Sequence, residues 1–310
     1  MNQINLNNKE YDVIIVGAGF SGLYQLICLR DQLGMNCLVV ETGDDVGGTW
    51  YWNRYPGARC DTESHAYSYY FSDELLKEWT WSERYPGHAE IRRYMNFVAD
   101  KFDLKKDILF NHKVTSAQYN EDKICWEITT NNKINFRSKF LITAVGCLSN
   151  ANIPKIKGLE NFKGKYYHTG NWPKNGVSFV GKKVGQIGTG STGIQAVPVI
   201  AEEAKHLTVF QRTANYSVPA RNKPLTENFK IHVKERFKYY RELLKKTPNG
   251  HPFEISDRLV ADVQEQEMQE IYEKAWEKGG LQFRGSFSDL VTNVEANKTA
   301  SDFIKSKINE

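Results

Sequence analysis

The chain has 310 residues, of which 40% are hydrophobic and 13% aromatic, and a formal net charge of +4 at pH 7. This size allows two or three domains with buried cores, and the small charge does not suggest a nucleic-acid or membrane-surface partner. Residues 1–10 are polar and unlike a signal peptide, and no apolar run could span a bilayer. Five cysteines without a CxxC pair indicate reduced thiols in a cytoplasmic protein, with no metal site and no redox-active disulfide. These are Cys28, Cys37, Cys60, Cys125 and Cys147.

The first motif is a dinucleotide-binding fingerprint. The apolar run at residues 13–16 is followed by GAGFSG. In such a unit the first glycine makes the turn, the second lets backbone approach a pyrophosphate, and the third lets the helix pack on the strand. The helix N-terminus then directs N–H groups at the phosphates. We therefore predict a helix over residues 21–33 and cofactor contacts from Gly17, Gly19, Phe20, Ser21 and Gly22.

The end of the next strand indicates which nucleotide is bound. Residues 37–40 are apolar and lead directly to Glu41. A carboxylate at this position accepts hydrogen bonds from free ribose hydroxyls and would repel a 2′-phosphate. The β-α-β unit of residues 11–45 is therefore predicted to bind FAD.

The following region mixes loops, a helix and strands. A loop rich in glycine and aromatic residues runs from residue 47 to residue 61, and apolar residues at three- and four-residue steps predict an amphipathic helix over residues 88–103. Alternating runs predict a β-meander within residues 113–136 and a further buried strand over residues 140–145. A connector with several prolines and glycines begins beyond Pro154.

A second fingerprint, GTGSTG, follows the run from Val184 to Ile187. The next strand, residues 207–210, leads to Arg212, at the same offset from the middle glycine as Glu41 in the first unit. A guanidinium pairs with a 2′-phosphate in bidentate fashion, which predicts NADPH as the ligand of residues 181–213. Contacts with this nucleotide are predicted for Thr189, Gly190, Ser191, Thr192, Gly193, Gln195, Arg212 and Thr213.

Helical patterns replace strands after Pro224. One amphipathic helix is predicted over residues 229–244 and another from residue 255 to residue 271, before Gly279 and Gly280, and a last short pattern reaches Glu310. The second nucleotide-binding region therefore has only two convincing strands. Because two parallel strands cannot cover their own faces, we expect a later segment or another chain to complete the sheet.

These elements predict an α/β fold with two Rossmann-type dinucleotide-binding domains and a helical insert. We expect an FAD-binding domain at residues 1–150, including the β-meander. A linker and the NADP-binding domain should occupy residues 151–223, and a helical segment residues 224–310.

Two motifs resemble a known family. FKGKYYHTGNWP, residues 162–173, matches the FxGxxxHxxxWP fingerprint of Baeyer–Villiger flavin monooxygenases at every specified position. GGTWYWNRYPG, residues 47–57, resembles their [AG]GxWxxxxYPG signature. The resemblance covers essentially the whole chain and is greatest for the phenylacetone and cyclohexanone monooxygenase branch. It implies that FAD, NADPH and O2 convert a ketone to an ester or lactone through a C4a-peroxyflavin.

The resemblance also implies roles for single residues. Asp61 would be the catalytic aspartate that holds a peroxide-stabilising arginine, and Arg59 and Cys60 would lie between the flavin and the nicotinamide. His168 would lie on the interdomain connector and act in domain motion, not in the chemistry. Further flavin contacts are implied for Thr49, Trp50, Tyr51, Trp52, Tyr67 and Val114.

The chain departs from the family at one point. The family's arginine lies in a YPxGxKR-like segment downstream of the helical insert, and no such segment precedes Glu310. The chain is therefore expected to correspond to a C-terminally truncated enzyme that oxidises NADPH without forming ester. Two alternatives stay open: an N- or S-oxygenating flavin monooxygenase, and an inactive fragment or half of a split enzyme with a complementing C-terminal chain. A ketone tested against a thioether would separate the two oxygenation reactions.

Overall fold

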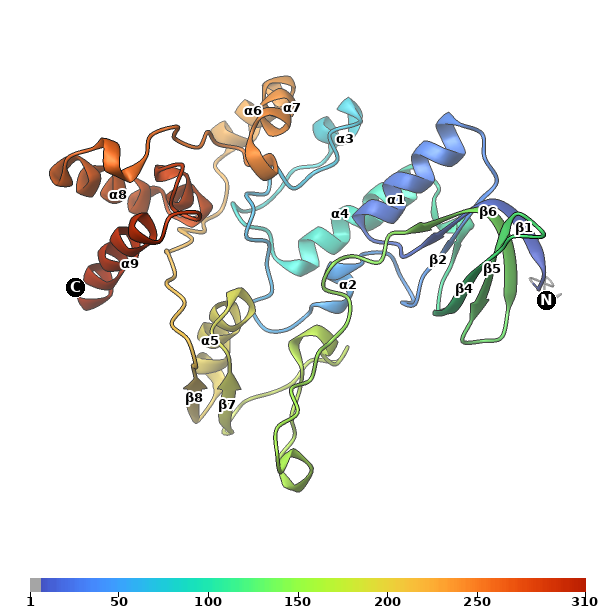
Figure 1. Cartoon of the computed structure of the whole chain (residues 1–310), viewed down its shortest axis with the longest axis horizontal. Helices are drawn as coiled ribbons and strands as arrows, with labels where there is room; N and C mark the ends of the chain where they lie inside the picture. The colour runs from blue at the N-terminus through green and yellow to red at the C-terminus, as the bar shows by residue number, and fades with distance from the viewer. Residues whose placement is uncertain (1–6) are drawn as a thin grey trace. The chain divides into compact units, whose positions relative to one another are not determined.

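The computed structural model describes residues 7–310 and divides the chain into two compact units (Figure 1). Unit 1 is formed by the chain up to Pro56 and by His88–Ser178; unit 2 is formed by Gly57–Gly87 and Phe179–Glu310. Segment 57–87 thus belongs to unit 2, although it lies within the sequence range expected for the FAD-binding domain. The expected domain boundaries stay a prediction. The expectation that residues 1–10 are not a signal peptide falls partly on residues 1–6, which lie outside the described residues.

Unit 1 is built on a six-stranded sheet with the order β3-β2-β1-β6-β5-β4 (Figure 1). The central strand β1 pairs in parallel with β2 and β6, and β2 pairs in parallel with β3. On the other side, β4, β5 and β6 form the predicted antiparallel meander. The strands are β1 (Lys9–Val16), β2 (Cys37–Val40), β3 (Ile108–Leu109), β4 (Val114–Asn120), β5 (Cys125–Thr130) and β6 (Asn135–Thr143).

One strand prediction is wrong. Residues 134–136 and 140–145 were expected to form separate strands, but β6 is continuous over residues 135–143. The reason is that β6 has two partners: its first half pairs with β5, and β1 pairs along its length. Ile14, Ile128 and Phe136 bring the three strands into one buried cluster.

The helices of unit 1 follow the apolar pattern closely. The helix predicted at residues 21–33 is α1 (Phe20–Leu26), which continues as a π-helical turn at Ile27–Gln32. The amphipathic helix is α4 (His88–Lys101), whose buried side chains include Ile91 and Met95. A short helix that was not predicted, α2 (Thr49–Trp52), lies in the aromatic loop.

Unit 2 contains the second β-α-β unit. β7 (Lys183–Ile187) and β8 (His206–Phe210) pair in parallel, and α5 (Ser191–Glu203) connects them. Within residues 7–310 no third strand joins this sheet. A short helix that was not predicted, α3 (Asp73–Glu78), also belongs to unit 2.

The helical region has different boundaries from those predicted. The single helix expected over residues 229–244 is two helices, α6 (Glu227–Glu235) and α7 (Phe237–Lys246), because Arg236 leaves the helical conformation at φ −113° and ψ 20°. The helix expected from residue 255 is also wrong: α8 begins only at Glu265 and ends at Lys278. The last helix, α9 (Val294–Asn309), is longer than expected, and the Asn293 side chain caps its first turn.

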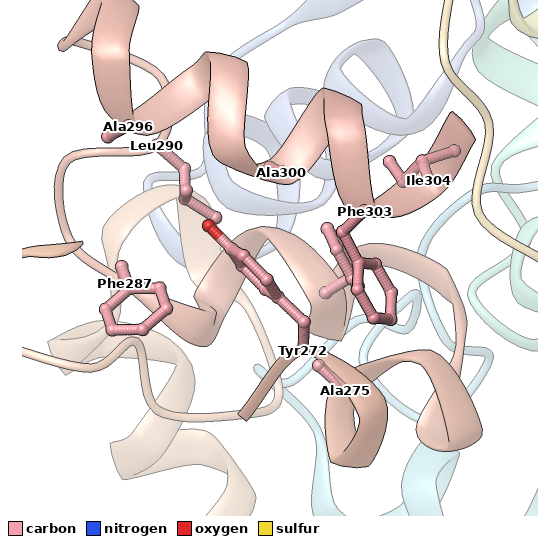
Figure 2. Close-up of a cluster of buried hydrophobic side chains, with 9 residues drawn as sticks. Tyr272, Ala275, Phe287, Leu290, Ala296, Ala300, Phe303 and Ile304 are labelled. Atoms are coloured by element: carbon pink, nitrogen blue, oxygen red, sulfur yellow. The ribbon is translucent and has the colours of Figure 1, made fainter. Parts of the chain in front are cut away.

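Helices α8 and α9 and the segment between them enclose an aromatic core (Figure 2). The fully buried ring of Tyr272 lies 5.4 Å from the ring of Phe283 and 5.3 Å from that of Phe303. Its hydroxyl forms a 2.8 Å hydrogen bond with Thr299 Oγ1, which satisfies the polar end of the side chain. In the described part of the chain, no helix is long and apolar enough to cross a membrane.

Candidate functional site

The first fingerprint forms a closely packed turn between β1 and α1. Gly17 has φ +104°, and a Cβ atom added there would lie 2.6 Å from the carbonyl oxygen of Ala144. A Cβ at Gly22 would lie 1.8 Å from the carbonyl oxygen of Gly17, so the helix can pack on the turn only because position 22 has no side chain. Gly19 is the N-cap and no side chain caps the helix, which suits backbone N–H groups that receive a phosphate.

Glu41 lies beside this turn and is 5% exposed. Its Oε2 accepts a 2.7 Å hydrogen bond from the N–H of Ala18, and its Oε1 accepts a 2.7 Å hydrogen bond from the N–H of Gly43. These bonds hold the carboxylate in one orientation, and each oxygen keeps a lone pair for a ribose hydroxyl. The sequence indicates this residue but not its structural role in the turn.

The glycine pair at the start of the aromatic loop brings the loop against the first fingerprint. Gly48 has φ +52°, and a Cβ there would lie 2.7 Å from the Cα of Gly19. The N–H of Gly47 donates a 3.1 Å hydrogen bond to the carbonyl oxygen of Ala18. Helix α2, which carries predicted flavin-contacting residues, therefore begins next to the fingerprint turn. In this helix Trp50 and Tyr51 are buried and Thr49 is exposed.

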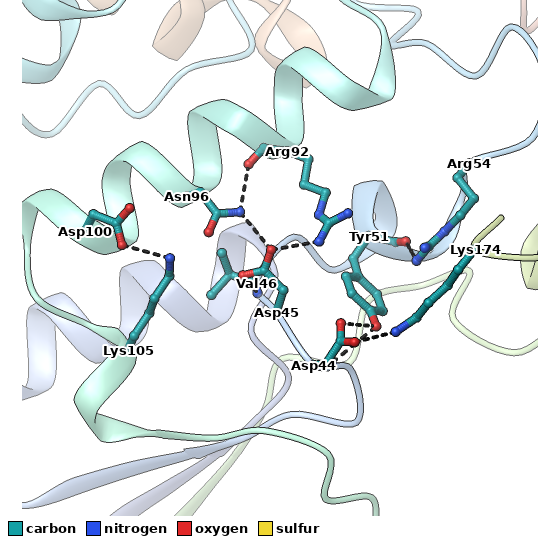
Figure 3. A network of polar contacts seen from close by, with 10 residues as sticks. All are labelled: Asp44, Asp45, Val46, Tyr51, Arg54, Arg92, Asn96, Asp100, Lys105 and Lys174. Atoms are coloured by element: carbon teal, nitrogen blue, oxygen red, sulfur yellow. Dashed lines mark hydrogen bonds and ion pairs between the residues drawn. The ribbon is translucent and has the colours of Figure 1, made fainter. Parts of the chain in front are cut away.

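A polar network holds this loop (Figure 3). The Tyr51 hydroxyl donates a 2.6 Å hydrogen bond to Asp44, and Lys174 also binds the Asp44 carboxylate, which lowers its pKa. Arg54, Arg92 and Lys174 lie 4.8, 5.1 and 5.5 Å from the centre of the Tyr51 ring. Arg54 is close to Tyr51 in the sequence, but Arg92 and Lys174 are far from it in the chain, and no local pattern indicates their contact with this ring.

The residues of the FxGxxxHxxxWP motif make local contacts within the connector. Nδ1 of His168 accepts a 3.1 Å hydrogen bond from the N–H of Gly170 and caps the short turn at Thr169–Asn171. The ring of Tyr167 lies 5.6 Å from that of the buried Trp172. This geometry gives His168 a structural role, and its predicted part in domain motion stays a prediction.

The second fingerprint has the same third-glycine contact but an open front. A Cβ at Gly193 would lie 2.4 Å from the carbonyl oxygen of Gly188, whereas a Cβ at Gly188 or Gly190 would have no atom within 4 Å. Thr189 is held by two side chains that were not predicted from the sequence: Gln211 donates to its hydroxyl at 2.7 Å, and Asn215 donates to its carbonyl oxygen at 3.3 Å.

The predicted phosphate-binding residues lie beyond the end of β8. Arg212 and Thr213 are exposed, as is Ser191 at the start of α5, and Thr192 is half-buried. In the described part of the chain, the guanidinium of Arg212 has no acceptor. This side chain is therefore available to an anion from solution.

The structure brings three predicted residues of unit 2 together. Gln195 on α5 donates to Oδ1 of Asp61 at 2.7 Å and to the carbonyl oxygen of Arg59 at 3.1 Å. Between them, Cys60 is buried, which raises the pKa of its thiol to about 12 and keeps it protonated. Tyr67 is half-buried, and its N–H donates to the carbonyl oxygen of Ser64 at 3.0 Å.

The remaining predictions concern Val114 and ligands other than nucleotides. Val114 begins β4 in unit 1 and pairs with Thr130. All five cysteines are free thiols. Among residues 7–310, no group of three or more histidine, cysteine, aspartate or glutamate side chains is arranged to hold a metal ion.

Comparisons with known proteins agree with the two fingerprints. Residues 10–276 match the family described as flavin-binding monooxygenase-like. The chain is 45% identical to cyclohexanone 1,2-monooxygenase of an Acinetobacter species, over 97% of this chain and 56% of the relative. It is 43% identical to a Baeyer–Villiger monooxygenase of Pseudooceanicola batsensis, over 97% of this chain and 55% of the relative.

A solved structure extends the similarity to the fold. The structure of an oxidised steroid monooxygenase bound to NADP superposes with a TM-score of 0.92 and 46% identity, over 97% of this chain and 57% of that one. The predicted α/β fold and the resemblance to Baeyer–Villiger monooxygenases are confirmed. The chain spans a little over half the length of the curated relatives it matches. It belongs to the flavin-binding monooxygenase-like family.

Proposed function

We propose that unit 1 binds FAD, that unit 2 binds NADPH, and that both serve a Baeyer–Villiger monooxygenase that converts a ketone and O2 to an ester or lactone. A cytoplasmic location is part of the proposal. A complementing chain is not, since nothing in the comparisons points to one. The observation that carries the proposal is the contrast between two similar fingerprints: one strand ends in the buried carboxylate of Glu41, and the other leads to the exposed guanidinium of Arg212.

The residues of unit 1 fit a dinucleotide with a free ribose. The pyrophosphate would lie against the uncapped turn at Gly19, Phe20 and Ser21. Because Gly19 has no Cβ, the phosphates could approach the backbone closely there. Glu41 is fixed by two backbone donors, so its carboxylate is pre-oriented toward the ribose hydroxyls. A 2′-phosphate on this ribose would face the buried negative charge of Glu41.

The residues of unit 2 fit a dinucleotide with a 2′-phosphate. Arg212 would form a bidentate ion pair with that phosphate, and Thr213 would add a hydroxyl donor. The open space at Gly188 and Gly190 leaves room for the pyrophosphate at the start of α5. Asp61, whose carboxylate is exposed and held by Gln195, would orient a cationic group of the reaction site.

When bound, FAD would supply the chemistry of oxygen activation, with NADPH as the source of the hydride. The chain itself would bind and orient the two nucleotides. Cys60 would take no part in acid–base chemistry near neutral pH, because burial raises its pKa to about 12. A ketone and a thioether offered to the flavin-loaded protein would decide between the proposed reaction and S-oxygenation, the product being identified by mass spectrometry.

The nucleotide assignment is tested by titration calorimetry with NADPH and NADH. Arg212→Ala should weaken NADPH binding by about 2–3 kcal/mol, on the order of a hundredfold, and leave NADH binding almost unchanged. Equal weakening of both nucleotides would show that Arg212 does not bind the phosphate. For FAD, Glu41→Arg should abolish flavin retention, with Glu41→Gln as the size-matched control and circular dichroism as the check that each variant is folded.

A further inference from the structure

We propose that Gln195 is a positioning residue that couples the NADPH-binding helix α5 to the carboxylate of Asp61. The inference rests on the proposed function and deepens it, because it gives the nucleotide a route by which it regulates the reaction site. It is carried by the contacts between α5 and segment 57–61, both of which belong to unit 2.

The side-chain amide of Gln195 makes three hydrogen bonds to this segment. Nε2 donates to Oδ1 of Asp61 at 2.7 Å and to the carbonyl oxygen of Arg59 at 3.1 Å, and Oε1 accepts the N–H of Arg59 at 3.3 Å. Two donors and one acceptor at this reach are supplied by glutamine; glutamate lacks the donors, and asparagine is one methylene shorter. Gln195 therefore fixes both the backbone at Arg59 and the side chain of Asp61.

The bond to Gln195 engages one carboxylate oxygen and leaves the other open. Oδ2 of Asp61 has no donor among the described residues, and the residue is exposed. An aspartate held through Oδ1 presents Oδ2 in a defined direction, which is the requirement for orienting a cation. Without Gln195 the carboxylate would rotate about its side-chain bonds.

The backbone adds a second connection between the same two elements. Gly57 has φ +77°, and a Cβ there would lie 2.2 Å from the carbonyl oxygen of Gln195 and 3.3 Å from Cγ2 of Val199. Segment 57–61 therefore lies directly on α5, about one turn from the end at which the phosphates would bind. Because packed elements move as bodies, a displacement of α5 on nucleotide binding would be transmitted to Asp61.

The opposite side of the segment is held independently of Gln195. The N–H of Cys60 donates to the carbonyl oxygen of Pro86 at 3.0 Å, and the Arg59 guanidinium donates to the carbonyl oxygen of Tyr85 at 3.4 Å. Loss of the Gln195 amide should therefore leave the backbone of the segment in place. The Asp61 side chain would then lose its connection to α5 without unfolding of unit 2.

Hydrogen exchange with and without NADP+ tests the coupling in the full 310-residue chain. In the wild type, NADP+ should slow exchange at the start of α5 and also at residues 59–61. In Gln195→Met, which keeps the length but loses the amide, the slowing at α5 should persist, and that at residues 59–61 should be reduced to what the backbone contact at Gly57 transmits. The NADP+ dissociation constant should rise about three- to tenfold, which corresponds to a coupling free energy of about 0.7–1.4 kcal/mol between the nucleotide site and Asp61.

Two further variants make the test specific. Gln266→Met makes the same change at an exposed position of α8 (Glu265–Lys278) and should behave as wild type. Gln195→Glu keeps the length but places a carboxylate against Asp61, and should reduce the response at residues 59–61 in the same way even where Gln195→Met folds poorly. Thermal denaturation of each variant checks the fold.

The possible outcomes separate the inference from the proposed function. If NADP+ slows exchange at α5 but residues 59–61 respond equally in the wild type and in both Gln195 variants, the coupling is refuted while the nucleotide site stands. If NADP+ changes exchange nowhere in unit 2 of the wild type, the proposed function fails and the coupling fails with it.

Discussion

The two fingerprints have the same spacing of glycines but differ in how closely the rest of the chain surrounds them. In unit 1, whose sheet has six strands, a Cβ at Gly17 would lie 2.6 Å from Ala144, and a Cβ at Gly19 would lie 3.3 Å from Gly48. In unit 2, Cβ atoms at Gly188 and Gly190 would have no neighbour within 4 Å, in a sheet of two strands. The motif alone does not determine this difference.

The contact that both turns share is the one internal to the motif. The third glycine meets the carbonyl oxygen of the first in each case, at 1.8 Å for a Cβ at Gly22 and at 2.4 Å for a Cβ at Gly193. The other contacts of the first turn come mainly from Gly48 and Ala144, which are distant in sequence, whereas the second turn adds only Gln186, which lies just before the motif. The same motif can therefore be closely packed in one unit and largely uncovered in the other.

The largest expected effect is that of Gly17→Ala, which is compared with Gly188→Ala. Gly17 has φ +104° and Gly188 φ +99°, so both substitutions should incur similar backbone strain, about 1–3 kcal/mol. Only Gly17→Ala also places a methyl group against the carbonyl oxygen of Ala144, which should cost about 1–3 kcal/mol more. Hydrogen exchange of β1 and β7 amides measures the loss in each unit separately.

The third glycines serve as the control for this pair. Gly22→Ala and Gly193→Ala should both destabilise their own unit, since each introduces a clash within the motif. Equal losses for Gly17→Ala and Gly188→Ala would show that the surroundings of the first turn do not matter, and would remove the difference between the two regions.

A smaller effect is expected for substitutions of the residues that follow the second strands. Glu41→Ala leaves the buried N–H groups of Ala18 and Gly43 without their acceptor and should lower the free energy of unfolding by about 2–4 kcal/mol. Arg212→Ala removes an exposed side chain that has no partner among residues 7–310, and should change the free energy of unfolding by less than about 0.5 kcal/mol. Thermal denaturation without nucleotide checks both values. A comparable loss in Arg212→Ala would mean that Arg212 also has a structural role.

The smallest effect concerns pH. Burial lowers the pKa of His65 in unit 2, and Arg84 and His232 lower it further against the opposite influence of Glu63. As the pH falls, His65 is protonated in the unfolded state before it is protonated in the folded state. The contribution of His65 to the free energy of unfolding should therefore be fully present above about pH 6.5. It should decrease as the pH falls from about 6.5 toward the lower pKa of the folded state, by at most about 1.4 kcal/mol per pH unit. His65→Gln should reduce this decrease, and the exposed His206→Gln should not; identical pH profiles for the two variants would contradict the prediction.

The sequence predicted features that depend on local pattern. Both β-α-β units and helix α4 follow from runs of apolar residues and spaced glycines, and they are confirmed. The predictions failed where tertiary contacts decide: β6 is continuous because two strands pair with it, and the helix expected over residues 229–244 breaks at Arg236.

The candidate site shows the same limit. Glu41 could be recognised from its place after a strand, but its two backbone bonds could not, since they depend on how the turn folds back. The contact between Lys174 and Asp44 joins residues far apart in the chain, and no short-range pattern indicates it. Likewise, Gln195 was predicted only as a nucleotide contact, and its bond to Asp61 emerges when segment 57–61 packs on α5.

The discontinuous composition of the two units has a consequence for protein engineering. The polypeptide passes from one unit to the other after Pro56, Gly87 and Ser178, so a unit exchanged between homologous enzymes requires three crossover points instead of one. A chimaera with a single junction near residue 150 would combine segment 57–87 of one parent with the Gln195 and Gln282 of the other. In such a chimaera the hydrogen bond from Gln195 to Asp61 and that from Gln282 to Glu63 would each join residues from two different parent enzymes.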